Sequence, residues 1–251
     1  VIADFEAAEA MIKYFIEEVN NRRRLISPTI IICVPSGATE VEERAIKESA
    51  VNAGAKRVWL IYEPMAAAIG AGLPVNDPTG SMVVDIGGGT TDIAVLSLGG
   101  IVVDSSIRIG GDHFDESIVR YVKKVHNVLI GERTAEEIKI SVATVSPNGR
   151  NESISVRGRD LVTGLPTTFS VTSEDCRLAL EDSIASLVAT IRGVLEKCPP
   201  ELAADIMTRG IYLAGGGALI KGLDKLITEE TGMPVKIADN ALDCVVTGAG
   251  N

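Results

Sequence analysis

The stretch Met82-Val-Val-Asp-Ile-Gly-Gly-Gly-Thr-Thr-Asp92 decides the fold. It is an apolar strand that runs directly into Gly87–Gly89, with Asp85 at the strand end. Glycines let backbone N–H groups converge on an anion because no Cβ atoms stand in the way. The segment Ile211-Tyr-Leu-Ala-Gly-Gly-Gly-Ala-Leu219 has the same order. A tight strand turn explains one such loop equally well, whereas two loops with an acid before one of them favour an anion site.

Polar residues beside the first loop suit phosphate chemistry. Asp85 can hold a hydrated Mg²⁺ next to phosphates, because Mg²⁺ keeps several waters and takes few protein ligands. A turn acceptor is the alternative reading of this aspartate. Thr90 and Thr91 can orient a phosphate or a water through their hydroxyls, although both residues also suit a strand. Neither loop matches the glycine patterns of P-loop or dinucleotide-binding sites.

Hydrophobic periodicity outside the loops predicts an α/β protein. The chain has 251 residues, 46% of them hydrophobic, which is enough for one large or two modest domains. Helices are expected at 4–19, 40–53, 65–71, 112–125 and 174–197, with one more ending at 231; strands are expected at 29–34, 58–62, 81–86, 91–98, 101–109, 154–156, 167–171, 210–214 and 235–238. Capping boxes are expected at Thr39 with Glu42 and at Thr134 with Glu137. Gly99-Gly100 is expected to form a two-residue hairpin turn.

Charge and composition exclude several classes of protein. The sequence has 24 Lys and Arg against 34 Asp and Glu, a net charge of −10. A general nucleic-acid binder needs the opposite sign, so we expect no nucleic-acid partner. Four scattered cysteines and two histidines do not have zinc-site spacing. No apolar run approaches the roughly 20 residues of a membrane-spanning helix.

Longer motifs carry a specific resemblance. The stretch from Asp85 to Asp92 resembles the second phosphate loop of the superfamily of actin, heat-shock chaperone and sugar-kinase ATPases. Further segments resemble the MreB/Mbl-type bacterial actin homologues, and the resemblance covers essentially the whole chain. These segments are Tyr62–Gly72, Ser106–Asp112, Ile130–Lys139, Val156–Pro166 and Pro199–Asp205.

The resemblance implies an actin-like ATPase fold of ribonuclease H-like sheets flanked by helices. Residues 1–79 would form the remainder of a first large subdomain. Residues 80–117 and 176–238 would form the second large subdomain with the nucleotide loops, and 118–175 a small inserted α+β subdomain. Residues 239–251 would return to the first subdomain.

The resemblance also implies ATP or ADP with Mg²⁺ as ligands and a role for each matching residue. Asp85 would be the Mg²⁺-associated aspartate, and Glu63 would polarise the attacking water together with Thr90. The backbone donors to the phosphates would be Gly87, Gly88 and Gly89; the turn beneath the nucleotide Gly110, Gly111 and Asp112; the ribose and purine contacts Glu136 and Lys139; and the adenosine loop Gly215, Gly216, Gly217 and Ala218. Judged by spacing alone, Glu136 and Lys139 are more often a surface pair.

The implied function is that of a filament-forming bacterial cytoskeletal protein with slow ATP hydrolysis, which organises cell-wall synthesis and cell shape at the inner membrane. Its implied partners are further copies in protofilaments, membrane proteins of cell-wall elongation, and the membrane surface. The segment Arg22-Arg23-Arg24-Leu25-Ile26 suits that surface, because cations meet headgroups while aliphatic tips insert. A solvated basic helix end is the alternative.

Two related activities remain as alternatives on the same fold. A small-molecule kinase would need a carboxylate base aimed at a substrate hydroxyl, and a chaperone-type ATPase would need a substrate-binding domain. The first phosphate loop typical of the superfamily, Asp-x-Gly-Thr, does not occur in the sequence. We therefore expect this chain to bind ATP weakly or not at all and to hydrolyse it poorly.

Overall fold

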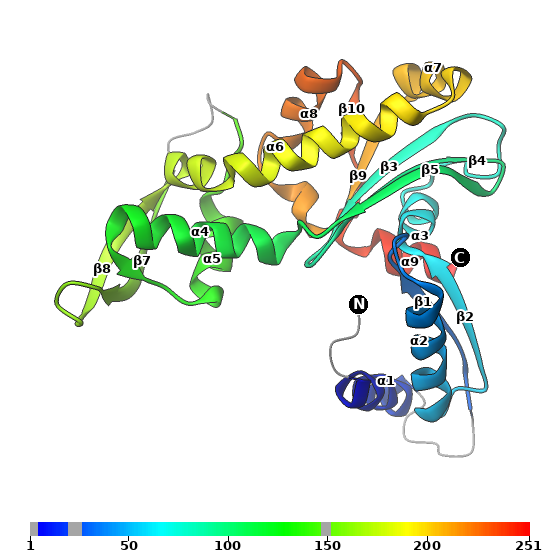
Figure 1. Cartoon of the computed structure of the whole chain (residues 1–251), viewed down its shortest axis with the longest axis horizontal. Helices are drawn as coiled ribbons and strands as arrows, with labels where there is room; N and C mark the ends of the chain where they lie inside the picture. Colours follow the sequence, from blue (N-terminus) through cyan, green and yellow to red (C-terminus); the bar gives the residue numbers. More distant parts are fainter. Residues whose placement is uncertain (1–4, 20–26, 147–151) are drawn as a thin grey trace.

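The computed structural model describes residues 5–19, 27–146 and 152–251, and their strands form three sheets (Figure 1). The largest has the strand order β10-β9-β3-β4-β5, beside a parallel pair β1-β2 and a three-stranded sheet β6-β7-β8. The strands are β1 Thr29–Val34, β2 Arg57–Tyr62, β3 Ser81–Ile86, β4 Thr91–Ser97, β5 Gly100–Ile107, β6 Val128–Leu129, β7 Ser153–Asp160, β8 Pro166–Thr172, β9 Ile211–Ala214 and β10 Val235–Ile237. The predicted α/β class is confirmed.

Helices flank these sheets along the whole chain. They are α1 Phe5–Val19, α2 Glu40–Asn52, α3 Glu63–Gly70, α4 Gly111–His126, α5 Glu132–Val142, α6 Ser173–Lys197, α7 Pro200–Arg209, α8 Leu223–Thr231 and α9 Cys244–Gly250, with short 3₁₀ turns η1 Gly216–Leu219 and η2 Ala241–Asp243. None of the described helices is both long and apolar enough to cross a bilayer. The predicted membrane segment, residues 22–26, lies outside the described residues.

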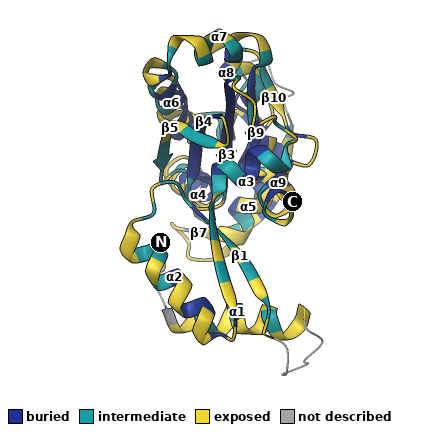
Figure 2. Ribbon diagram, turned by 90° about the vertical axis from the view of Figure 1, so that its right-hand side faces the viewer, coloured by how far each residue is buried: buried dark blue, intermediate teal, exposed yellow. Residues whose placement is uncertain are grey.

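The five-stranded sheet contains the core. Every residue of β3 and β4 is buried, and Figure 2 shows them as the dark centre of the molecule. Because side chains alternate along a strand, one face packs Val84 and Ile93 against α4 and α6. The opposite face packs Val83 and Ala94 against α3 and α9. Asp85 is two residues after Val83 on the same strand, so its side chain points to the same face of the sheet, toward α3.

The α3–α9 contact allows backbone to approach backbone. A Cβ added at Gly70 would lie 1.9 Å from the Cys244 carbonyl oxygen, and one at Gly248 would lie 1.8 Å from that of Ala66. Only glycine permits such an approach. This contact joins the β1–β2 part of the chain to the large sheet.

The β1–β2 pair is far more exposed than the large sheet. Ile31 is 50% exposed and Trp59 is 60% exposed. In Figures 1 and 2 the pair extends from the main body together with α1 and α2. The capping box predicted at the start of α2 is present, since Glu42 N–H donates to Thr39 Oγ1 and Thr39 N–H donates to the Glu42 carboxylate.

Two local predictions were wrong. Helix α5 begins at Glu132 with Gly131 as its N-cap, so Thr134 is already inside the first turn and forms no capping box with Glu137. The β4–β5 turn is Leu98-Gly99 rather than Gly99-Gly100, because Ser97 pairs with Gly100. Leu98 has φ 51° and Gly99 has φ 72°, which is the left-handed geometry of a tight hairpin turn.

Candidate functional site

The two glycine loops leave the same edge of the sheet. Strands β3 and β9 are parallel neighbours, with Asp85 paired to Ala214, so Gly87–Gly89 and Gly215–Gly217 follow adjacent carboxyl ends. Gly215 has φ 80°, and a Cβ there would lie 2.3 Å from the Ile86 carbonyl oxygen. A Cβ on Gly217 would lie 2.2 Å from Ile86 Cγ2. The close packing on Ile86 requires small residues in the second loop and brings both loops together.

In the first loop, Gly87–Gly89, more carbonyl groups than amide groups form hydrogen bonds. Gly87 O accepts from Gly111 N–H at 2.9 Å, and Gly88 O accepts from Asp112 N–H at 2.8 Å. Within the described part of the chain, the N–H groups of Gly88 and Gly89 donate to no acceptor. Gly88 and Gly89 are exposed. Unpaired amides in an exposed glycine loop are suited to hold an anion.

Gly110 lies directly under this loop. A Cβ on Gly110 would be 2.5 Å from the Gly88 carbonyl oxygen and 2.7 Å from that of Gly87. Both contacts are with backbone, so no side-chain rotation relieves them. The start of α4 is therefore packed against the first glycine loop through a residue without a side chain.

Three carboxylates meet beside the first loop. Asp85 on β3 is directly opposite Asp92 on β4 in the antiparallel register, and both side chains are buried. Glu63 is the first residue of α3, the helix that packs on this face of the sheet. Thr90 is half-buried at the end of the loop, where its carbonyl accepts from Gly87 N–H at 2.9 Å.

Burial and neighbouring negative charges raise the pKa values of Glu63 and Asp85. Burial, and then the charges of Asp92 and Asp85, raise the pKa of Glu63 from 4.5 to about 7. Burial and then the charge of Asp92 raise the pKa of Asp85 from 3.8 to about 6. The same two acids also affect the Cys33 thiol: burial, and then the charges of Glu63 and Asp85, raise its pKa to about 11. Strongly raised pKa values of grouped acids are typical of functional sites.

A divalent cation fits this charge distribution. The Asp85 carboxylate has no hydrogen-bond partner among the described residues, although it is 5% exposed. Buried carboxylates without partners are costly, and a cation relieves that cost. No group of three or more described His, Cys, Asp or Glu residues is arranged to hold a metal by itself. A single carboxylate beside open space suits a largely hydrated Mg²⁺.

Lys139 and Glu136 on α5 differ in their surroundings. The ammonium of Lys139 donates to the Gly111 carbonyl oxygen at 3.0 Å and to Asp115 Oδ2 at 2.7 Å, which connects α5 to the first turn of α4. Burial raises the pKa of Asp115 despite this partner. Glu136 is exposed one turn away and adds negative charge near Asp115. Lys139 is therefore placed next to the glycine turn, and Glu136 is free to meet a ligand.

The remaining predicted positions fall in the same region. Asp112 is exposed, and a Cβ on Gly88 would lie 3.7 Å from its Oδ1 atom. Ala218 is fully buried, whereas Gly216 between the two packed glycines is exposed. Gly216 is therefore the exposed residue of the second loop, next to the first loop.

Sequence reasoning assigned no role to Asp92, Ser36 or Cys33. Ser36 donates to Asp92 Oδ1 from its backbone N–H at 3.0 Å and from its hydroxyl at 3.2 Å. Hairpin counting could have found Asp92, because residues equally distant from a loop face each other across it. No local signal identifies Ser36, which lies 56 residues away in sequence.

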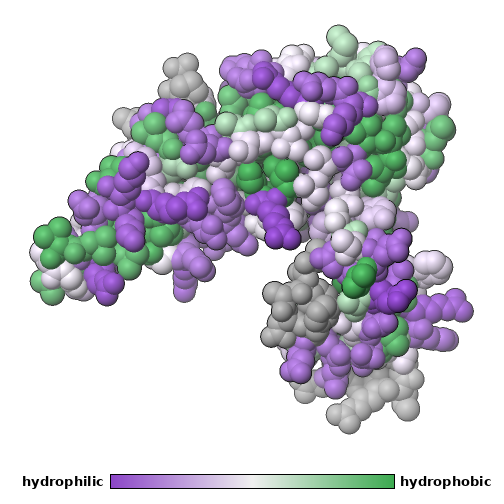
Figure 3. All heavy atoms as spheres, in the orientation of Figure 1, coloured by the Kyte–Doolittle hydropathy of each residue, from purple (hydrophilic) through white to green (hydrophobic). Residues whose placement is uncertain are grey.

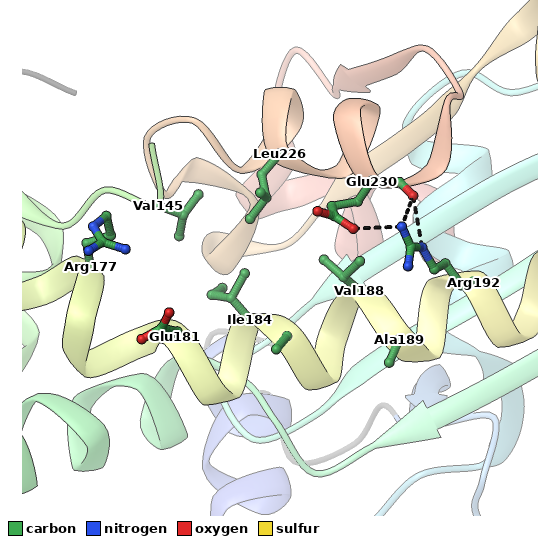
Figure 4. Close-up of a pocket in the computed structure, with 10 residues that line it drawn as sticks. Val145, Arg177, Glu181, Ile184, Val188, Ala189, Arg192, Leu226 and Glu230 are labelled. Carbon is green, nitrogen blue, oxygen red and sulfur yellow. Dashed lines mark hydrogen bonds and ion pairs between the residues drawn. The ribbon is translucent and has the colours of Figure 1, made fainter. Parts of the chain in front are cut away.

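A cavity of about 500 Å³ lies away from these carboxylates, between α6 and α8 (Figure 4). Its floor is apolar, with Val145, Ile184, Val188 and Leu226. The Arg192 guanidinium donates to the Glu230 carboxylate at 2.7 Å and closes one end. The cavity therefore contains neither the glycine loops nor the acids, and the chemistry described above does not occur there.

Comparison with known proteins gives one family. Residues 1–251 match the MreB/Mbl protein family. The cell shape-determining protein Mbl of Bacillus subtilis is 54% identical over 250 residues, which cover 100% of this chain and 75% of that protein. The cell shape-determining protein MreB of Escherichia coli is 53% identical over 251 residues, which cover 100% of this chain and 72% of that protein.

Solved structures agree with this result. The crystal structure of MreB5 of Spiroplasma citri bound to ADP matches with a TM-score of 0.94 and 39% identity, over 100% of this chain and 75% of that one. A MamK double helical filament matches with a TM-score of 0.82 and 22% identity, over 99% of this chain and 75% of that one, which shows the fold alone. The chain therefore belongs to the MreB/Mbl family of cell shape-determining actin homologues.

Proposed function

We propose that this protein binds ATP and ADP with Mg²⁺ between its two glycine loops and hydrolyses ATP slowly. The observation that carries the proposal is the meeting of Glu63 and Asp85 with unpaired loop amides at Gly88 and Gly89. Structures of the related MreB5 are described as bound to ADP and to AMPPNP. Phosphoryl transfer to water depends mainly on positioning and charge stabilisation, and this arrangement supplies both.

Each group has a distinct part in this proposal. The amides of Gly88 and Gly89 cradle phosphate oxygens, whereas the Gly87 N–H is already bonded to the Thr90 carbonyl oxygen. Asp85 holds Mg²⁺, which neutralises phosphate charge when bound. Glu63, with its pKa near 7, accepts a proton from water close to neutral pH. Thr90 orients that water through its hydroxyl. Gly215–Gly217 and Ala218 border the adenosine, while Glu136 and Lys139 contact ribose and purine.

We further propose that the nucleotide controls assembly into protofilaments. The hairpin tip between β7 and β8 exposes three aliphatic residues, with Leu161 at 41%, Val162 at 83% and Leu165 at 65%. Figure 3 shows hydrophobic atoms at that end of the molecule. Clustered exposed apolar side chains typically mark a contact surface. The proposed partner is a second copy of the protein, since MamK, which has the same fold, forms a double helical filament.

The proposed setting is the cytoplasmic face of the inner membrane, where the filaments organise cell-wall synthesis together with membrane proteins of cell-wall elongation. Residues 22–26 provide the proposed membrane contact. Replacement of Leu25 and Ile26 by Ser is expected to abolish co-flotation with anionic liposomes. Unchanged flotation of this variant would contradict the membrane contact.

Nucleotide titration and phosphate release test the central proposal. Glu63→Gln is expected to keep ATP affinity within about 3-fold while lowering turnover by about 100-fold, because general-base catalysis contributes about that much. Asp85→Asn is expected to remove the Mg²⁺ dependence of binding. Asp104→Asn, at an exposed position of β5, is the matched control. Equal turnover of wild type and Glu63→Gln would refute the role of Glu63, and the same titration measures the weak binding expected of this chain.

A further inference from the structure

A short contact joins two parts of the molecule across the carboxylate site. The turn after β1 places Ser36 so that its N–H and its hydroxyl both donate to Asp92 Oδ1, at 3.0 and 3.2 Å. Asp92 is 1% exposed. Within the described ranges, these are the only hydrogen bonds from β1, α2, β2 or their loops to the five-stranded sheet. Loss of such donors would leave a buried carboxylate without hydrogen-bond partners, which is energetically costly.

The turn lies over one row of the sheet. Asp85, Asp92 and Ser106 are directly opposite one another on β3, β4 and β5. A Cβ on Gly37 would lie 3.3 Å from Ser106 Cβ, so the turn covers the Asp92–Ser106 end of that row. The Ala38 N–H donates to the Pro35 carbonyl oxygen at 3.0 Å and closes the turn. The turn is therefore a compact clasp rather than a loose loop.

The same contact lies at the edge of the β1–β2 pair from which Glu63 also leaves. Strands β1 and β2 are parallel, and Val34 pairs with Tyr62. The chain leaves β1 through Pro35-Ser36 and leaves β2 directly into Glu63, so both depart from one edge of the pair. Holding Ser36 on Asp92 holds that edge, and Glu63 with it, against the strand that carries Asp85. The α3–α9 contact anchors the other side.

We propose that Ser36 and Asp92 are positioning residues, whose two hydrogen bonds strap the β1–β2 edge to the phosphate-loop sheet and keep Glu63 at a working distance from the site of Asp85. Neither residue contacts the nucleotide in this proposal. The effect on turnover depends on the proposed ATP hydrolysis, whereas the strap itself does not. A misplacement of about 1 Å in a catalytic group can lower a rate by about 100-fold.

Four variants test the strap by steady-state ATP hydrolysis. Asp92→Ala removes the acceptor and is expected to lower kcat by about 10-fold with KM for ATP within about 2-fold, since uniform binding is untouched. Asp92→Asn keeps an acceptor oxygen for both donors and is expected to retain at least about a third of kcat. Ser36→Ala keeps the N–H donor and is expected to lose about 3-fold. Asp104→Ala, exposed on β5, is the control.

The double variant Ser36→Ala with Asp92→Ala is expected to be no slower than Asp92→Ala alone, because one contact cannot be lost twice. Full multiplication of the two single effects would overturn the strap. Equal damage by Asp92→Asn and Asp92→Ala would also overturn it, since the charge and not the hydrogen bonds would then matter.

Amide hydrogen exchange provides a readout that needs no turnover. The Ser36 N–H is protected only while it donates to Asp92, so Asp92→Ala is expected to accelerate its exchange at least about 10-fold. Asp104→Ala is expected to leave it unchanged. Unchanged exchange in Asp92→Ala would refute the strap even in an active enzyme. Absence of turnover in the wild type, with exchange accelerated as expected, would instead refute the proposed hydrolysis and support the strap.

Discussion

The strongest test of the carboxylate site is the replacement of Asp85 by Asn, which keeps the shape of the side chain and removes its charge. Burial and the charge of Asp92 raise the pKa of Asp85 from 3.8 to about 6 in the folded protein. The folded state therefore holds a proton that the unfolded state has already lost. Stability from this group is complete below about pH 4 and falls as pH rises toward about pH 6.

The size of the effect follows from the pKa. A rise from 3.8 to about 6 corresponds to about 3 kcal/mol, at about 1.36 kcal/mol for each pH unit. Relaxation around the ionised group reduces this value, so we expect about 2 kcal/mol. Above about pH 7, Asp85→Asn should therefore be about 2 kcal/mol more stable than the wild type. Near pH 4 that advantage should be absent, because both side chains are then neutral.

Urea unfolding followed by circular dichroism measures the difference, without nucleotide and with a chelator. Asp104→Asn is the matched control, because Asp104 is an exposed aspartate on β5, two strands away from Asp85 in the same sheet. The difference between Asp85→Asn and the wild type should change by about 2 kcal/mol between about pH 3.5 and about pH 8. A difference that is the same at both pH values would refute the electrostatic reasoning. A change of the same size in Asp104→Asn would show that the effect is not specific to the site.

Three further substitutions test the backbone geometry. Gly110→Ala places a Cβ 2.5 Å from the Gly88 carbonyl oxygen, so calorimetry should show ATP affinity reduced by at least about 10-fold. Gly248→Ala places a Cβ 1.8 Å from the Ala66 carbonyl oxygen, and urea unfolding should show a loss of about 3 kcal/mol. Leu98→Asn relieves a leucine with φ 51° that is 72% exposed, and the same assay should show a gain of about 0.5–1 kcal/mol. Unchanged or higher ATP affinity in Gly110→Ala, unchanged or higher stability in Gly248→Ala, or lower stability in Leu98→Asn would contradict the respective prediction.

The fold was largely predictable because its central strands are unambiguous. The run Met82–Ile86 is apolar except for Asp85 and stops at glycine, and it forms the fully buried strand β3 as expected. The loop after β9 repeats this order, and parallel pairing places the two loops together. Both features depend on residue order along a strand, which a sequence displays directly.

Boundaries fixed by tertiary packing were less predictable. The start of α5 is at Glu132, because Gly131 takes the capping position that the Thr134 pattern suggested for a later residue. No helix was expected after Pro199, although Pro200 occupies a first-turn position of α7, where a missing N–H costs nothing. The hairpin turn moved by one residue because strand pairing forced Leu98 into a left-handed conformation.

The three acids of the site differ in their hydrogen-bond partners. One carboxylate oxygen of Asp92 accepts both hydrogen bonds from Ser36, so donors within the protein stabilise this carboxylate. Asp85 and Glu63 have no such donors among the described residues, and their pKa values are raised partly by the charge of Asp92. Because pairing across the hairpin places Asp92 opposite Asp85, one residue both accepts the hydrogen bonds of Ser36 and contributes to the raised pKa values of its two neighbouring acids.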